Sequence, residues 1–522
     1  MPQNGNAAWY FLYRHLNEGR GERLAFQDPH RRLRYADLAA AAGRFAAALT
    51  AAGIGRERRI ALVMLDTVDF PVAFWGALAA GVVPVPVNTM LTPEQTAYVL
   101  ADSRAEAVVV AAPLAPPLRP LLAHLPALRH VIVVAPDGAA AATEGSNEVA
   151  WDAFLDMRTG LPAPVEVSPD EVAFWLYSSG STGLPKGARH VHSSLRATAD
   201  TYAAQVLGIA ADDLVFSAAK LFFAYGLGNA MTFPMSVGAA AVLLPERPTP
   251  DAVRAVMTRF QPSIFGGVPT LYAGLLAQPG LGRGAGSARL RRCISAGEAL
   301  PEPVGRRWEE TVGVEILDGL GSTEMLHIFL SNYPGDVRYG TSGRPVPGYE
   351  ARIVDPEGND VADGTAGELV VRGPSAAEGY WNQRDKSRRT FRGEWTHTGD
   401  TYMREPDGSY RYQGRADDMM KVGGIWVSPF EVEAALLVHP AVLEVAVVGE
   451  QDADGLTKPK AFLVLRQDAA DTPVDRLRDE LKAEVQHRIG VWKYPRWIEV
   501  VESLPKTATG KIQRYKLRRQ DP

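Results

Sequence analysis

The sequence predicts an α/β protein, with a large N-terminal domain of layered α/β sheets and a small α+β domain at the C-terminus. Up to about residue 340, short apolar runs typical of buried strands alternate with helical patterns. Beyond that point the runs are shorter and are bounded by Asp-Pro, Asp-Gly and Pro-Asp-Gly turns. This second pattern indicates an antiparallel or barrel-like subdomain.

The layered part contains predicted strands at Arg59–Leu65, Ala107–Val110, His130–Val134, Val172–Tyr177, Leu214–Phe216, Ser263–Gly266 and Arg292–Ser295. The predicted helices between them include Tyr35–Gly53, Pro250–Phe260 and Pro301–Thr311. Because helices separate the strands along the chain, we expect the strands to pair in parallel.

The barrel-like part contains predicted strands at Glu350–Val354, Gly367–Arg372 and Ser409–Tyr412. From about Asp418 the patterns alternate again, over about 100 residues, which is an ordinary size for a domain. There we predict helices at Pro429–Val438 and Val474–Ile489, and strands at Val442–Gly449 and Lys460–Arg466.

Composition excludes several classes of protein. A single cysteine, Cys293, excludes an intrachain disulfide and a cysteine-based zinc cluster. The 55 basic and 60 acidic residues give a net charge of −5, which argues against nucleic acid or an anionic membrane as the main partner. The stretches Phe70–Pro93 and Leu221–Pro245 are long enough to span a membrane, but glycines and prolines interrupt both. We therefore expect a cytoplasmic enzyme with no membrane partner.

A segment rich in serine and glycine, Ser178–Gly187, follows the predicted strand Val172–Tyr177. Glycines allow several backbone N–H groups to converge, and the hydroxyl groups and Lys186 complete a cradle for an anion such as phosphate. Composition alone leaves an ordinary turn open. The Walker A pattern finds no match, and no strand precedes the dinucleotide-like Gly280–Ala285.

Six ordered segments resemble the motifs of adenylate-forming enzymes, the superfamily of acyl- and aryl-CoA synthetases, peptide-synthetase adenylation domains and firefly luciferase. They are Ser178–Gly187, Ser295–Glu298, Asp318–Glu324, Thr398–Asp400, Gly414–Asp418 and Pro505–Lys511. Ser178 stands where the family commonly has threonine. The resemblance extends from about Tyr35 to Arg514, and it implies that ATP activates a carboxylate for transfer to coenzyme A.

The resemblance implies a role for each motif residue. It assigns ATP binding to Ser178, Ser179, Gly180, Ser181, Thr182, Gly183, Lys186, Gly297, Glu298, Asp318, Gly319, Thr323, Asp400 and Arg415. Thr323 would bind the α-phosphate, and Asp400 would accept the ribose hydroxyls. Glu324 would hold Mg²⁺, a hard ion that favours carboxylate and phosphate oxygens. Lys511 would be the adenylation lysine, which makes Lys511, Thr323 and Glu324 the predicted catalytic residues.

The resemblance also divides the chain into an N-terminal domain at 1–413, a hinge at 414–418 and a mobile C-terminal domain at 419–522. Asp417 is implied as the residue whose dihedral angles change when the small domain rotates after adenylation. The rotation would withdraw Lys511 and bring the CoA-binding residues Lys421, Gly423 and Gly424 to the site. For the two glycines, an ordinary turn is the alternative.

Two segments, Lys220–Asn229 and Met325–Asn332, resemble those of benzoate–CoA ligases. By that match, the acyl pocket is lined by Ala224, Tyr225, Ala296, Gly321, His327 and Ile328. Small residues beside flat aromatic ones suit a planar ring of the size of benzoate. His190 and His192 have the spacing of metal ligands on one face of a strand, but no third ligand is evident.

The predicted activity is therefore that of a benzoate–CoA ligase, in which ATP, CoA and an aryl carboxylate give aryl-CoA, AMP and pyrophosphate. Four alternatives stay open: a ligase for hydroxy- or aminobenzoate, an aryl adenylating enzyme that loads a carrier protein, a catalytically silent binding protein, and a luciferase-like oxygenase. The expected partners are small molecules rather than nucleic acid or membrane, and the chain would be a monomer or a homodimer.

Overall fold

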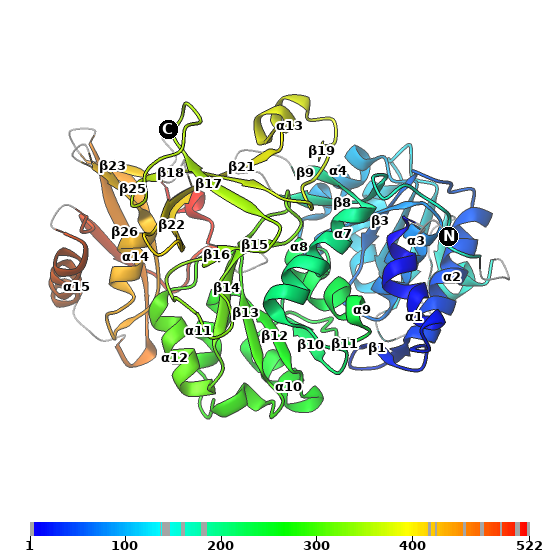
Figure 1. Cartoon of the computed structure of the whole chain (residues 1–522), viewed down its shortest axis with the longest axis horizontal. Coiled ribbons are helices and arrows are strands. Elements are labelled where there is room, and N and C mark those ends of the chain that lie inside the picture. Colours follow the sequence, from blue (N-terminus) through cyan, green and yellow to red (C-terminus); the bar gives the residue numbers. More distant parts are fainter. Residues whose placement is uncertain are drawn as a thin grey trace.

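A computed structural model of the whole chain provides the structure of this protein. It describes residues 5–135, 137, 143, 147–157, 162–178, 185–415, 419–422, 425–452, 456–469, 474–490, 493–506 and 512–518. Figure 1 shows the N-terminal elements on the right, a large sheet at the centre and the C-terminal elements on the left. This arrangement confirms the predicted fold class, a large N-terminal region of sheets and helices followed by a smaller C-terminal unit.

The central sheet has nine strands in the order β16-β15-β14-β13-β12-β10-β11-β1-β2. The strands between β14 and β1 pair in parallel, and the pairs at both ends of the sheet are antiparallel. Their bounds are β1 Leu24–Gln27, β2 Arg32–Arg34, β10 Leu214–Ser217, β11 Ala240–Val242, β12 Ile264–Gly267, β13 Arg292–Ser295, β14 Ile316–Gly321, β15 Ile328–Ser331 and β16 Arg344–Pro345.

A second sheet, of five strands in the order β4-β3-β5-β6-β7, is parallel throughout, as predicted. Its strands are β3 Arg59–Val63, β4 Val83–Pro86, β5 Ala107–Ala111, β6 His130–Val134 and β7 Glu148–Ala150. Every residue of helix α3 (Asp69–Ala79) is buried, so the first long apolar stretch forms a core helix followed by strand β4. Within the described ranges, no helix combines the length and the apolar character that crossing a membrane requires.

Most α-helices of the N-terminal region follow a strand in sequence. Besides α3, the α-helices of this region are α1 Arg14–Asn17, α2 Tyr35–Ala51, α4 Pro93–Ser103, α5 Ala115–Leu122, α6 Trp151–Leu155, α7 His192–Thr198, α8 Ala224–Leu227, α9 Phe233–Val237, α10 Pro250–Phe260, α11 Pro269–Leu276, α12 Glu302–Val312 and α13 Arg384–Thr390. Helix α10 shows why these ends could be predicted, because the Thr249 hydroxyl accepts the N–H of Ala252 and Pro250 occupies the first turn.

The third sheet corrects the prediction of parallel pairing. Strand β8 (Val172–Ser178) pairs with β9 (Lys186–Val191) in an antiparallel manner, and β19 (Gly379–Tyr380) adds to the other edge of β9. A short connection joins β8 to β9, whereas a parallel crossover needs a dozen or more residues. The structure also contradicts a shared strand face for the two histidines, because His190 lies in β9 and His192 begins helix α7.

The barrel-like part is antiparallel throughout. Its strands are β17 Glu350–Val354, β18 Ala366–Arg372, β20 Phe391–Arg392, β21 Trp395–Arg404 and β22 Tyr410–Arg415. A tight turn at Pro406-Asp407-Gly408 connects β21 to β22, and Gly408 adopts the left-handed φ of 84° that favours glycine.

The C-terminal unit has a hydrophobic core of its own, formed by residues such as Val432, Val447, Leu463 and Leu477. Strands β25 and β26 are antiparallel, and β27 joins β26 in parallel. The elements are β23 Met420–Val422, β24 Ile425–Val427, α14 Pro429–Leu436, β25 Val442–Gln451, β26 Thr457–Leu465, α15 Val474–Ile489 and β27 Trp497–Val500. The division at 1–413, 414–418 and 419–522 stays a prediction.

Candidate active site

The predicted nucleotide-binding segments meet where two neighbouring parallel strands end. Ala296, Gly297 and Glu298 follow β13, and Asp318 lies on β14 directly opposite Ser295. In open parallel sheets, ligands bind outside the carboxyl ends of the strands. Gly297 has a φ of 94°, a left-handed conformation that turns the chain across the end of the sheet. The topology therefore places these segments at the edge where a ligand is expected.

Asp318 is a buried carboxyl group with incomplete hydrogen bonding. Its Oδ2 accepts the N–H of Leu300 at 3.3 Å, whereas Oδ1 has no partner among the described residues. Burial raises the pKa of Asp318 to about 8, so the carboxyl group is largely protonated at neutral pH. A buried polar atom without a partner is unusual, and a ligand with hydrogen-bonding groups would complete it.

Lys186, Tyr380 and Glu324 form a compact polar cluster from three separate segments. Lys186 begins β9 opposite Ser178, Tyr380 ends β19, and Glu324 follows β14. The Lys186 Nζ lies 3.3 Å from Glu324 Oε1 and donates to the Tyr380 hydroxyl at 2.6 Å. That hydroxyl in turn donates to Glu324 Oε1 at 2.6 Å. Burial alone would raise the pKa of Glu324, but Lys186 and Tyr380 outweigh it and hold that pKa below its ordinary value.

His190 holds the backbone beside this cluster. Its Nε2 donates to the carbonyl oxygen of Thr323 at 2.8 Å, and its ring stacks on Phe174 with centroids 5.2 Å apart. Burial lowers the pKa of His190 to about 4, so the ring is neutral at pH 7. Across the residues that the structure describes, no group of three or more His, Cys, Asp or Glu side chains could hold a metal ion. The histidine therefore positions Thr323.

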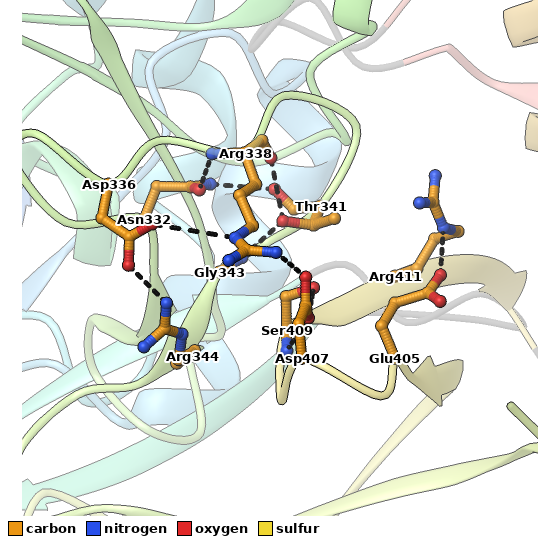
Figure 2. A network of polar contacts seen from close by, with 10 residues as sticks. All are labelled: Asn332, Asp336, Arg338, Thr341, Gly343, Arg344, Glu405, Asp407, Ser409 and Arg411. Carbon is orange, nitrogen blue, oxygen red and sulfur yellow. Dashed lines mark hydrogen bonds and ion pairs between the residues drawn. The ribbon is translucent and has the colours of Figure 1, made fainter. Parts of the chain in front are cut away.

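A polar network joins Asp318 to the hairpin that carries Asp400. Figure 2 shows Arg338 at its centre, where the guanidinium forms an ion pair with Asp407 in the turn between β21 and β22. The N–H of Arg338 donates to Asn332 Oδ1 at 2.8 Å, and Asn332 Nδ2 donates to the carbonyl oxygen of Asp318 at 3.1 Å. In the same hairpin, Asp400 pairs with Arg415 across β21 and β22.

The C-terminal unit reaches the same site through its last described segment. The N–H of Ile512 donates to Glu298 Oε1 at 3.0 Å. Two residues later, Arg514 forms a buried ion pair with Glu433 of α14, with Nη2 2.8 Å from Oε2. This pair attaches the segment 512–518 to the C-terminal unit, so the contact with Glu298 joins that unit to one of the predicted nucleotide-binding segments.

The predicted acyl-pocket residues also lie together. The Tyr225 hydroxyl lies 3.0 Å from the carbonyl oxygen of Ile294 in β13 and 3.1 Å from that of Gly267 at the end of β12, and its single O–H is shared between these two acceptors. His327 Nε2 lies 3.3 Å from the carbonyl oxygen of Tyr225, and burial lowers the pKa of His327 to about 3. Gly321 pairs with Ile328 across β14 and β15.

The remaining pocket residues belong to the same neighbourhood. Ala224 precedes Tyr225 in helix α8, and Ala296 follows strand β13, whose Ile294 carbonyl accepts the Tyr225 hydroxyl. Ala296 and Ile328 are buried. The group therefore presents neutral and apolar side chains.

Several predicted residues lie outside the described residues: Ser179, Gly180, Ser181, Thr182, Gly183, Asp417, Gly423, Gly424 and Lys511. The side chains of Arg415 and Lys421 do so as well. Their roles stay predictions.

Sequence reasoning missed Tyr380 and the Arg338–Asp407 pair. Each is a long-range contact, over 56 residues from Tyr380 to Glu324 and 69 residues from Arg338 to Asp407. A short-range pattern carries no signal for such pairs.

A cavity of about 730 Å³ lies elsewhere, among β1, β10 and the end of α10, and its lining includes Arg23, Arg32, Arg259 and Arg289. None of the predicted site residues lines it. The candidate active site is therefore located by the motifs that meet in the structure and not by this cavity.

Comparisons with known proteins identify the family of this chain. The family described as "AMP-binding enzyme" matches residues 13–381, and the "AMP-binding enzyme C-terminal domain" matches residues 431–511.

The chain is 51% identical to a benzoate–CoA ligase of Thauera aromatica over 99% of this chain and 96% of that protein. It is 52% identical to a 4-hydroxybenzoate–CoA/benzoate–CoA ligase of Rhodopseudomonas palustris, over 99% of this chain and 95% of that protein. A solved benzoate CoA ligase from Burkholderia xenovorans LB400 matches with a TM-score of 0.90 at 50% identity, covering 98% of this chain and 99% of that one. The chain therefore belongs to the AMP-binding enzymes, the adenylate-forming superfamily that its ordered motifs resemble.

Proposed function

We propose that this protein is an AMP-forming benzoate–CoA ligase, which joins benzoate to coenzyme A through benzoyl-adenylate and releases AMP and pyrophosphate. One observation carries the proposal: three proteins named for benzoate–CoA ligation are 50–52% identical over nearly the whole chain. None of the three is named for an aminobenzoate or for loading a carrier protein.

The polar cluster supports the adenylation step. Lys186 would bind phosphate oxygens, and Glu324 would hold Mg²⁺. Glu324 fits this ion because its pKa is held low, so that it stays anionic, and because Mg²⁺ in nucleotide sites needs only one or two carboxylates beside phosphate and water. When bound, the ion would neutralise charge on the triphosphate and let a carboxylate approach.

The two strand ends would bind the rest of the nucleotide. Asp318, with Oδ1 unpartnered among the described residues, would form a hydrogen bond with a polar group of the nucleoside. Asp400 would bind the ribose hydroxyls from β21, and the Arg338–Asp407 pair would hold that hairpin against the Asp318 segment. Lys511 would deliver positive charge to the carboxylate and α-phosphate oxygens while negative charge accumulates at the α-phosphorus.

The acyl pocket supports an uncharged aromatic ring as substrate. Tyr225 is tied to two backbone carbonyls, so its ring is fixed as one wall. His327 is neutral at physiological pH and lies beside Tyr225, which suits a benzoate ring. A ring with a second carboxylate would bury a charge against these neutral groups, at a cost in binding free energy.

The thioester half-reaction rests on the predicted hinge. Rotation about Asp417 would withdraw Lys511 from the active site and bring Lys421, Gly423 and Gly424 to it. The thiol of CoA would then attack the adenylate. The domain limits and a monomeric or homodimeric state belong to this part of the proposal.

A panel of carboxylic acids tests the proposal: benzoate, 4-hydroxybenzoate, 3-hydroxybenzoate, 2-aminobenzoate and acetate, each with ATP and Mg²⁺ and with or without CoA. We expect the highest kcat/KM for benzoate, with AMP release that requires CoA and with benzoyl-CoA as product. Exchange of pyrophosphate into ATP without any CoA-dependent release of AMP would indicate a carrier-loading enzyme. Failure of every acid to support exchange of pyrophosphate into ATP would indicate a silent protein.

A further inference from the structure

We propose that Tyr380 is a positioning residue for the metal–nucleotide complex, and that its hydroxyl orients the Glu324 carboxylate toward the metal. The inference rests on the proposed function, because it concerns the same ATP site. It adds a residue from a segment outside the six motifs.

Tyr380 contacts both charged members of the cluster. Its hydroxyl accepts from Lys186 Nζ and donates to Glu324 Oε1, each at 2.6 Å, while the direct ion pair is longer at 3.3 Å. The Lys186 Nζ also lies 3.9 Å from the centroid of the Tyr380 ring. The directions of the two hydrogen bonds leave the ammonium and the carboxylate both charged, with the phenol between them.

The backbone around Tyr380 is held on both sides. The strand β19 pairs with β9, and the N–H of Trp381 donates to the carbonyl oxygen of Gly187 at 2.8 Å. On the other side, the N–H of Ala377 donates to the carbonyl oxygen of Glu324 at 2.8 Å. The Tyr380 side chain is buried and packs against Ala188. Its hydroxyl is therefore fixed relative to both the phosphate segment and the Glu324 segment.

This arrangement has a consequence for ligand binding. Lys186 and Glu324 attract each other, yet the metal–nucleotide complex needs the ammonium at phosphate and the carboxylate at the metal. The Tyr380 hydroxyl uses only one of the three Lys186 donors, so others can turn to phosphate. Its own O–H keeps a hydrogen bond to Glu324 when the lysine turns away, so the carboxylate stays oriented.

The variant Tyr380→Phe tests this role, because it removes the hydroxyl but keeps the ring and its packing. The measurement is the dissociation constant of ATP by titration calorimetry, once with Mg²⁺ and once with EDTA. In the wild type, Mg²⁺ should tighten ATP binding. In Tyr380→Phe, the dissociation constant with EDTA divided by that with Mg²⁺ should fall about 10-fold or more. This is the effect expected from losing a hydrogen bond to a charged group.

A kinetic readout accompanies the binding measurement. In the exchange of pyrophosphate into ATP, KM for Mg·ATP should rise about 10-fold in Tyr380→Phe, while kcat should change by less than about threefold. A general loss of structure would lower the amount of active enzyme and leave KM unchanged.

Tyr35→Phe is the matched control. Tyr35 is also buried, and its hydroxyl donates to the carbonyl oxygen of Ala239 at 2.8 Å. Both variants lose one buried hydroxyl, but only Tyr380→Phe should change the effect of Mg²⁺. An unchanged Mg²⁺ ratio in Tyr380→Phe, or the same shift in both variants, would overturn the inference. A wild type that binds ATP but makes no aryl-CoA would instead reject the proposed function.

Discussion

The backbone N–H of Ile512 donates a 3.0 Å hydrogen bond to the carboxylate of Glu298 and so joins the C-terminal unit to one of the predicted nucleotide-binding segments. Ile512 directly follows Lys511, the predicted adenylation lysine, in the sequence. We therefore expect this contact to belong to the state in which adenylation is proposed to occur, before the small domain rotates.

Glu298→Ala should slow adenylation more than thioester formation. Losing a hydrogen bond to a charged group typically costs about 1.5–3 kcal/mol of stabilisation, so the rate of pyrophosphate exchange should fall about 10- to 100-fold. Transfer of benzoyl from supplied benzoyl-adenylate to CoA should change little, because that step follows the rotation.

Lys511→Ala should show the same pattern with a loss of about 10²–10³-fold or more.

Glu302→Ala is the matched control for Glu298→Ala, since Glu302 is a nearby carboxylate that pairs with Arg306 on the surface. It should leave both half-reactions unchanged. Equal damage to both half-reactions in Glu298→Ala would contradict a contact specific to adenylation.

Arg514→Leu should destabilise the C-terminal domain. Arg514 and Glu433 are both buried, and removing one partner of a buried ion pair typically costs about 3–5 kcal/mol. Hydrogen exchange in α14 and in residues 512–518 should become faster, while α3 keeps its protection. Arg306→Leu breaks an exposed pair and should cost less than about 1 kcal/mol. An unchanged rate of hydrogen exchange in α14 would show that the Arg514–Glu433 pair contributes little to the stability of this domain.

Asp318 should make stability depend on pH. Its pKa is about 8 in the folded protein and 3.8 ordinarily, so between these values the folded state holds a proton that the unfolded chain has lost. The free energy of unfolding should therefore fall as pH rises through this window, by about 1 kcal/mol per pH unit from this group. Melting temperatures of the wild type and Asp318→Asn, measured from about pH 5 to about pH 8, check this. A parallel dependence in both proteins would contradict it.

Ala296→Leu should reduce activity with benzoate more than with acetate. Ala296 is buried and directly follows β13, the strand whose Ile294 carbonyl accepts the Tyr225 hydroxyl. Overpacking a formed pocket costs about 1–3 kcal/mol, so kcat/KM for benzoate should fall about 5- to 150-fold. Acetate is too small to fill the pocket and should lose less. An unchanged ratio of the two kcat/KM values would mean that Ala296 does not line the pocket.

The elements that sequence alone predicted are those specified by local patterns. Strands β6 and β13 and helices α10 and α15 have the bounds expected from apolar periodicity and helix-start signals. The motif residues Asp318, Glu324 and Lys186 could be named because their order along the chain resembles a known superfamily, and the structure brings Lys186 and Glu324 together.

Only the tertiary structure decided which distant segments meet. Lys186 and Tyr380 are 194 residues apart in sequence, and Ile512 and Glu298 are 214 apart, yet each pair shares a hydrogen bond. The antiparallel β8–β9 pair and the division of His190 from His192 were likewise decided by how the chain pairs and packs. Periodicity reports which face of an element is buried, whereas the partner that covers it depends on the free energy of packing the whole chain.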